Sequence, residues 1–396
     1  MTLSEEIREL AAACKEKYID VRRHLHAHPE LSYVEFETVS YVKSQLEILG
    51  LKTIEMGGTG LVALIEGINP ASRVIALRAD MDALPIDEAN DVPYKSKIQG
   101  VMHACGHDAH TACLLGAADV LMQTREKWEG TVKLIFQPGE ERNPGGATYM
   151  IRDGVLENPV PQGIIALHVH PGLDTGKLSF RKGIVMASAD EIFISIKSKG
   201  GHAAAPQLTT DTILVASHII ISLQQIISRN NNPLNPSVLS ITSIQGGNTT
   251  NVIPAEVKLM GTLRCLNEDW RAKAHKLIEQ HVQHIAAAMG ADMELHIDKG
   301  YPTVLNHPEF TGNAWQLAEE YMGQENVEET EMRMGAEDFG YYAQEIPGCF
   351  FRLGVRNISK GIVSSVHTPT FDLDEDAIET GIAALAWLGA SSKLTQ

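Results

Sequence analysis

The residues of this chain best suited to chemistry lie around position 105. Cys105 and His107 are separated by a single glycine within the run 101–110. A thiolate and a neutral imidazole are ligands that borderline-soft divalent ions such as zinc prefer, and Gly106 lets the backbone turn tightly enough to direct both side chains inward. Taken alone, the pair fits a metal site and a buried cysteine beside a helix equally well, because the chain contains 16 histidines and 5 cysteines.

Further candidate ligands follow three short apolar runs of the kind that form buried strands. The carboxyl ends of parallel strands meet at one edge of a sheet, so side chains at these ends are expected to converge. The runs and their polar ends are residues 73–80 with Asp80, residues 131–138 followed by Glu140 and Glu141, and residues 163–170 with His168, stopped by Pro171. The Cys-x-His loop itself precedes a predicted helix over 108–124, which is also an element boundary.

The adjacent glutamates at 140 and 141 allow the division of labour that hydrolysis needs. One carboxylate can bind metal while its neighbour takes a proton from water and later passes it to a leaving nitrogen. A solvated surface pair is the simpler alternative. The constrained turn residues on both sides, Pro138-Gly before and Pro144-Gly-Gly after, favour the functional interpretation.

Ten short segments, in order along most of the chain, carry a resemblance to a known family. They are residues 24–32, 78–85, 102–111, 136–141, 167–171, 199–206, 251–254, 261–264, 335–339 and 367–371. Together they resemble the dinuclear metallo-amidohydrolases that include hippurate hydrolase, plant indole-acetyl-amino-acid hydrolases and bacterial N-acetyl-diaminopimelate deacetylase. A match in this order is far more specific than any single motif.

The resemblance implies a site with two divalent metal ions per chain. Zinc is expected from ligand softness, and manganese, nickel or cobalt also suit such ligands. By resemblance Cys105 is the bridging thiolate, Glu140 is the general base, and the remaining ligands are His107, Glu141, His168 and His367.

The same resemblance places three residues of a second domain against the substrate, namely His202, Asn251 and Arg264. It implies that the chain forms a homodimer through that domain and that His202 stabilises the oxyanion in the partner's site. The sequence departs from the family pattern at Gly139, where alanine is frequent, and at 142–144, which intervene where a Gly-Gly pair often follows the glutamates directly. These departures leave the substrate preference open.

Amide hydrolysis by two metal ions is chemically sound independently of the resemblance. Two metals about 3.5–4 Å apart can polarise an amide carbonyl and neutralise the developing oxyanion without a covalent intermediate. The sequence contains no Gly-x-Ser-x-Gly, Gly-x-Gly-x-x-Gly or Gly-x-x-x-x-Gly-Lys motif. Their absence argues against a serine hydrolase, a dinucleotide enzyme and a P-loop enzyme.

The pattern of elements predicts an α/β protein of two domains. Residues 187–299 read β-α-β-β-α-β, which is typical of a ferredoxin-like α+β domain. The flanks, 1–186 and 300–396, are then expected to form one discontinuous catalytic domain, resembling the zinc exopeptidases, with a mixed sheet flanked by helices. The inserted domain is expected to act as a lid and a dimerisation domain.

Composition indicates a globular protein of the cytoplasm. The chain has 44% hydrophobic and 21% charged residues, and no apolar run approaches the length of a membrane span. Its net charge of −17 argues against nucleic acid or anionic membranes as partners. The acidic beginning does not resemble a signal peptide, and five widely spaced cysteines suggest no disulfide framework.

These observations favour a metal-dependent amidohydrolase that acts on N-acyl amino acids or similar small amide conjugates. Two alternatives remain: an exopeptidase that cleaves dipeptides, and an inactive relative that only binds such molecules. Glu140 separates the enzymes from the binding protein, because a binding protein needs no second carboxylate beside a metal ligand. It does not separate the two enzymes, since both cleave an amide next to a free carboxylate.

Overall fold

The computed structural model describes residues 1–395, and their contacts divide them into two compact units. The first unit comprises Met1–Val185, Leu305–Glu331 and Asp338–Gln396, and the second comprises Met186–Val304 and Met332–Glu337. The chain therefore leaves the first unit, builds the second, and returns. Two short strands that pair with each other, β7 (Gly183–Met186) and β14 (Val304–Asn306), lie where the chain passes between the units.

The first unit is built on an eight-stranded mixed sheet. Its centre is parallel, with β3, β4, β5 and β16 side by side, and antiparallel strands extend it on both sides. The central strands are buried on both faces, as their continuous apolar sequences predict. In sheet order the strands are β1 (Thr53–Met56), β2 (Gly60–Glu66), β4 (Thr131–Gln137), β3 (Val74–Asp80), β5 (Gly163–Asp174), β16 (Gly348–Arg356), β6 (Leu178–Phe180) and β15 (Val327–Glu329).

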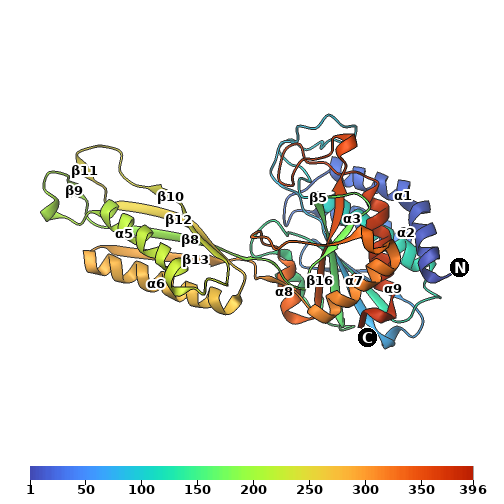
Figure 1. Cartoon of the computed structure of the whole chain (residues 1–396). Coiled ribbons are helices and arrows are strands. Elements are labelled where there is room, and N and C mark those ends of the chain that lie inside the picture. The colour runs from blue at the N-terminus through green and yellow to red at the C-terminus, as the bar shows by residue number, and fades with distance from the viewer. Residues whose placement is uncertain (396) are drawn as a thin grey trace. The chain divides into compact units, whose positions relative to one another are not determined.

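Helices cover this sheet, and one of them carries the Cys-x-His loop at its start. Helix α3 is buried along most of its length and packs against both α1 and α9, which also contact each other (Figure 1). A capping box between Thr2 and Glu5 begins α1. The helices of the unit are α1 (Leu3–Ala27), α2 (Phe36–Ile48), α3 (His107–Gln123), α4 (Gly146–Arg152), α7 (Pro308–Met322), α8 (Phe339–Glu345) and α9 (Ala377–Ala390).

The second unit has the predicted β-α-β-β-α-β order. Its antiparallel sheet runs β10-β12-β8-β13, and α5 and α6 cover one face of it (Figure 1). Asp211 and Asn267 cap the two helices, and Gly290 ends α6 in the left-handed conformation. The elements are β8 (Ser188–Lys197), α5 (Thr212–Gln225), β10 (Ser237–Gln245), β12 (Glu256–Cys265), α6 (Glu268–Met289) and β13 (Asp292–Lys299), with a small ladder of β9 (Gly201–His202) and β11 (Val252–Ile253). The α/β fold class with an inserted ferredoxin-like domain is thus confirmed.

Three details differ from the sequence expectations. Strand β5 does not stop at Pro171 but continues to Asp174, because the ladder with β16 is irregular between Gly354 and Arg356 and so tolerates a residue without an N–H. Residues Met332–Glu337 group with the second unit, although they were expected in the flank. The helical stretch Thr212–Asn230 is long and apolar enough to cross a membrane by length and composition, and it packs on the sheet of its own unit.

Candidate metal centre

The loop before α3 holds Cys105 and His107 in a fixed relation. Gly106 is the N-cap residue of the helix and has a φ of +87°, a conformation that L-residues avoid. A Cβ atom there would also lie 2.5 Å from Cγ2 of Val169 on β5. Glycine at 106 therefore meets two requirements at once, the backbone turn and the close approach of the loop to the sheet.

The structure brings together all five residues that the resemblance implied as ligands, and they lie within the first unit. The Cys105 Sγ atom is 3.5 Å from His168 Nε2 and 3.3 Å from His367 Nε2. His367 Nε2 lies 3.2 Å from a carboxylate oxygen of Glu141, and His107 Nε2 lies 3.9 Å from the same oxygen. These atoms form two groups of three, Cys105 with His107 and His168, and Cys105 with Glu141 and His367. The two groups share the thiol, which is the arrangement a bridging ligand requires.

Glu140 joins this cluster from the loop after β4. One of its carboxylate oxygens is 4.0 Å from His107 Nε2, and its side chain is 8% exposed. With Glu141 it forms a further group of possible ligand atoms around His107. The two glutamates thus approach the same imidazole from neighbouring positions, and Glu141 is the one that also reaches His367.

Asp82, which follows β3, orients both halves of the cluster. The Nδ1 atom of His107 is 2.9 Å from the Asp82 carbonyl oxygen and 3.2 Å from its carboxylate. The other carboxylate oxygen accepts from the backbone N–H of Glu141 at 2.9 Å and from the Ser32 hydroxyl at 2.6 Å. Sequence reasoning assigned Asp82 no role; its place two residues after Asp80 at a strand end was the available signal.

His110 lies beside the cluster, and protein groups occupy both of its ring nitrogens. Its Nδ1 atom is 2.6 Å from a carboxylate oxygen of Asp80, and its Nε2 atom accepts from the backbone N–H of Val169 at 2.9 Å. Asp80 in turn is paired with Arg78 at 2.7 Å. This buried chain holds the segment next to His168, and Asp80 also approaches the predicted ligand set, because its other carboxylate oxygen lies 3.7 Å from the Nε2 atom of His107.

The donor set fits divalent metal ions. Within residues 1–395, the Nε2 atom of His107 is buried without a hydrogen-bond partner. Unpaired buried polar atoms are costly unless something outside the chain satisfies them. Sulfur, imidazole nitrogen and carboxylate oxygen, gathered within 4.8 Å, are ligands of such ions. The unpaired buried atom and the ligand types of the cluster therefore both indicate a metal centre.

The pKa values of the proposed ligands are consistent with a metal centre. Burial raises the pKa of the Cys105 thiol, and burial lowers the pKa of His168 well below its usual value. Hydrogen bonds to Cys105 and Glu141 raise the pKa of His367 to about 10. A metal binds the deprotonated forms of these groups, so metal uptake must release protons and becomes easier as pH rises.

The three residues predicted to face the substrate lie in the second unit. His202 on β9 is exposed and pairs with Val252 of β11. The backbone N–H of Ala203 donates to the carbonyl of Asn251 at 3.0 Å, so His202 and Asn251 belong to one loop cluster. Arg264 lies elsewhere in that unit, on β12, and burial lowers its pKa.

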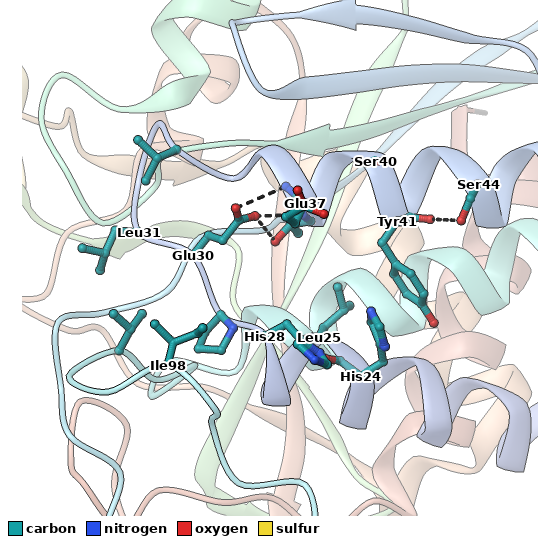
Figure 2. A pocket seen from close by; sticks show the side chains of 14 residues that line it. His24, Leu25, His28, Glu30, Leu31, Glu37, Ser40, Tyr41, Ser44 and Ile98 are labelled. Atoms are coloured by element: carbon teal, nitrogen blue, oxygen red, sulfur yellow. Dashed lines mark hydrogen bonds between the residues drawn. The ribbon is translucent and has the colours of Figure 1, made fainter.

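A cavity of about 650 Å³ lies apart from these residues, between the end of α1, the start of α2 and the loop near Ile98 (Figure 2). None of the predicted site residues lines it. The Glu30 carboxylate at its wall accepts from the backbone N–H groups of Glu37 and Thr38, and the His24 ring stacks on Tyr41. Leu31 and Val34 of its wall neighbour Ser32 and Glu35, which contact Asp82 and Gly139.

Comparison with known proteins identifies the family. Residues 76–388 match peptidase family M20/M25/M40. The chain is 43% identical over 386 residues to the putative amidohydrolase YhaA of Bacillus subtilis, covering 97% of each protein. It is 39% identical over 380 residues to the N-acetyl-L-cysteine deacetylase of Bacillus subtilis, covering 96% of this chain and 89% of that protein. The solved structure of the Bacillus subtilis YXEP protein, described as a dinuclear metal-binding peptidase of this family, superposes with a TM-score of 0.82 at 35% identity, covering 96% and 98%.

The chain belongs to peptidase family M20/M25/M40. It is a metal-dependent hydrolase of amide bonds. The resemblance found in the sequence is thereby confirmed, and its fold and reaction class with it.

Proposed function

We propose that this protein removes the acyl group from N-acyl amino acids or similar small amide conjugates by metal-dependent hydrolysis. The observation that carries the proposal is the pair of three-ligand groups that share Cys105, with Glu140 beside them. We propose Cys105, His107, Glu141, His168 and His367 as the ligands of two divalent ions. Zinc is the proposed native metal because the set includes a thiol, and manganese, nickel and cobalt are the alternatives.

The bound ions would supply polarisation of the amide carbonyl and a lowered pKa for water at the site. The chain's own residues then handle the protons. Glu140, buried and not needed in either three-ligand group, takes a proton from the attacking water as the new C–O bond forms. It passes that proton to the leaving nitrogen as the C–N bond breaks, so the products are a carboxylic acid and an amine. Asp82 keeps the Nε2 atom of His107 directed at the site.

The substrate class is proposed from one relative and one residue. The deacetylase relative is named for an N-acetyl amino acid. Arg264 has a guanidinium group that can hold a substrate carboxylate through paired hydrogen bonds, and Asn251 is proposed as a second contact. Exopeptidase action on dipeptides is the alternative, because the YXEP protein is described as a peptidase.

A substrate panel separates these reactions. The metal-loaded protein is assayed with N-acetyl, N-benzoyl and indole-acetyl derivatives of the same amino acids, and with dipeptides that carry the same carboxyl-terminal residue. We expect kcat/KM for at least one acyl series to exceed that for the matched dipeptides at least tenfold. Faster cleavage of the dipeptides would establish the exopeptidase, and no turnover with both metals bound would indicate a binding protein.

We further propose that residues 187–299 act as a lid and dimerisation domain and that His202 serves the partner subunit's site. Two features of the second unit support an association surface. Strand β10 is an unpaired edge of its sheet, and the outer side of α5 exposes Ile213, Leu214 and Ile221, the last at 71%. A two-fold dimer is the commonest closed assembly that covers such surfaces.

Mixing two inactive variants tests this shared site. Glu140→Gln lacks the proposed base and His202→Ala lacks the proposed oxyanion donor, so subunit exchange creates dimers in which one site contains both intact residues. We expect activity to return after exchange, up to about one quarter of the parent level for random mixing of one active site in each mixed dimer. Confirmed exchange by native mass spectrometry without recovered turnover would refute a site shared between subunits.

A cytoplasmic location, without nucleic acid or membrane partners, is proposed from the surface and the thiols. The net charge of −17 repels anionic polymers and lipids, and all five cysteines are free thiols in the structure. Cell fractionation with an antibody against the native protein would test the location.

A further inference from the structure

Tyr33 adopts a backbone conformation that an aromatic residue rarely takes. Its φ is +68°, in the left-handed region, and it lies in the short segment between α1 and α2. Such a conformation persists only when the surroundings impose it, and it is concentrated at functional sites. The contacts of residues 32–35 show what imposes it here.

Glu35 contacts the loop after β4 and does not cap the helix that it begins. It is the N-cap residue of α2, yet its carboxylate makes no cap hydrogen bond, because Glu30 accepts from the backbone N–H groups of Glu37 and Thr38 (Figure 2). The Glu35 carboxylate is fully buried and accepts from the backbone N–H of Gly139 at 2.8 Å. It also accepts from the Thr59 hydroxyl at 2.5 Å and from the Tyr33 N–H at 2.9 Å.

Tyr33 holds the same loop at two further points. Its ring occupies the space that a Cβ atom would need at Gly139, whose φ is +58°. Its hydroxyl donates to the carbonyl of Arg142 at 2.5 Å and accepts from the N–H of Gly145 at 3.0 Å. The side chain therefore spans the loop from residue 139 to residue 145, and Glu140 and Glu141 lie between its points of contact.

We propose that Tyr33 and Glu35 are positioning residues that clamp the loop 139–145 and thereby fix where Glu140 and Glu141 meet His107. Ser32 completes the arrangement, since it donates to the Asp82 oxygen that also accepts from the Glu141 N–H. The clamp also explains a departure from the family pattern. Glycine replaces the frequent alanine at 139 because the Tyr33 ring takes the place of the methyl group.

This inference rests on the proposed metal-dependent function, and its first test reads out the metals themselves. Tyr33→Ala is compared with Tyr41→Ala, a matched change of a partly buried tyrosine on α2. We expect Tyr33→Ala to weaken metal binding about 10–100-fold, to alter the visible absorption of the cobalt-loaded protein, and to lower kcat more than it raises KM. Tyr41→Ala should match the parent in all three.

Conservative variants show whether a loss of metal binding comes from the missing contacts or from unfolding of the protein. Tyr33→Phe keeps the ring over Gly139. Glu35→Gln keeps an oxygen that accepts from the Gly139 N–H, and its NH2 group can donate to the Thr59 hydroxyl, which then accepts the hydrogen bond that it donates in the parent. Both should restore metal affinity to within about threefold of the parent, whereas Glu35→Ala should not. A cobalt spectrum and metal affinity in Tyr33→Ala equal to those of Tyr41→Ala would overturn the clamp.

A second test needs no metal, so it separates failure of the clamp from failure of the proposed function. Gly139→Ala is made in the parent and in Tyr33→Ala, and unfolding is measured in EDTA. Gly58→Ala is the reference, because Gly58 has a φ of +87° with nothing within 4 Å of its Cβ position. In the parent, we expect Gly139→Ala to raise the unfolding constant at least tenfold more than Gly58→Ala does. In the Tyr33→Ala background, we expect the two alanine substitutions to raise the unfolding constant by the same factor. Equal effects in both backgrounds would overturn the pairing of Tyr33 with Gly139.

Discussion

Gly106→Ala is the perturbation whose cost the structure defines best. The new Cβ meets two separate penalties. An L-residue in the left-handed region costs about 1–2 kcal/mol, and the lower conformational entropy of the unfolded chain returns about 0.4–1 kcal/mol of that. The contact with Val169 at 2.5 Å is an overpacking term of about 1–3 kcal/mol in a buried site. The free energy of unfolding should therefore fall by about 1–5 kcal/mol.

Gly58→Ala carries only the first penalty, the left-handed backbone, because its φ is also +87° and its Cβ position is open. It should cost about 1 kcal/mol or less. The difference between the two variants is then the packing term, about 1–3 kcal/mol. Since Gly106 joins two proposed ligands, that strain is relieved by moving Cys105 away from His107, so Gly106→Ala should also lose metal affinity while Gly58→Ala keeps it.

The assay is urea unfolding followed by tryptophan fluorescence in a Trp270→Phe background. Trp128, Trp315 and Trp387 remain there, and all three lie in the first unit, so the signal reports the unit that holds the loop. Metal content is measured on the same samples by elemental analysis. Equal stability losses at 106 and 58, together with two metals in Gly106→Ala, would refute the view that this glycine sets the ligand geometry.

Three further predictions concern the metals and a buried cation. Cys105→Ala should hold fewer than two metals and lose turnover, because both three-ligand groups contain that thiol, and elemental analysis checks this. Removing the metals with EDTA should lower Tm by about 5–10 °C in calorimetry, given about 2.7 kcal/mol from ligand at 100 times its Kd and about 2–4 °C per kcal/mol. Burial lowers the pKa of Lys133 to about 8 from 10.5, so its charge disfavours the folded state below about pH 8, and this cost disappears as pH rises through 10.5. The parent should therefore gain stability relative to Lys133→Met between these pH values in urea titrations, and a difference that does not change with pH would contradict the assignment.

Sequence patterns predicted the fold because the elements have strong local signals. The central strands β3 and β4 are buried on both faces and read as continuous apolar runs, and α6 ends at a glycine in the left-handed conformation. Pro171 misled the prediction because the irregular ladder with β16 lies far away in sequence. A local signal cannot show which hydrogen bonds a distant strand will leave unmade.

The candidate site was predicted in part. Strand ends and the family resemblance indicated the clustered residues, and the structure adds how they are held. Asp82 bonds His107 across 25 positions of the chain, and Glu35 bonds Gly139 across 104, so no spacing rule connects them. Tyr33 left no signal in the sequence, since its left-handed backbone arises from tertiary contacts.

The central claim is that Glu141 binds metal while its neighbour Glu140 moves the proton. Their glutamine variants test it most directly, because each change removes one charge from the same loop. We expect Glu140→Gln to keep two metals and lose about 10²–10⁴-fold in kcat, with KM nearly unchanged. Glu141→Gln should instead lose metal. A Glu140→Gln protein within threefold of the parent kcat at full metal loading would contradict the account.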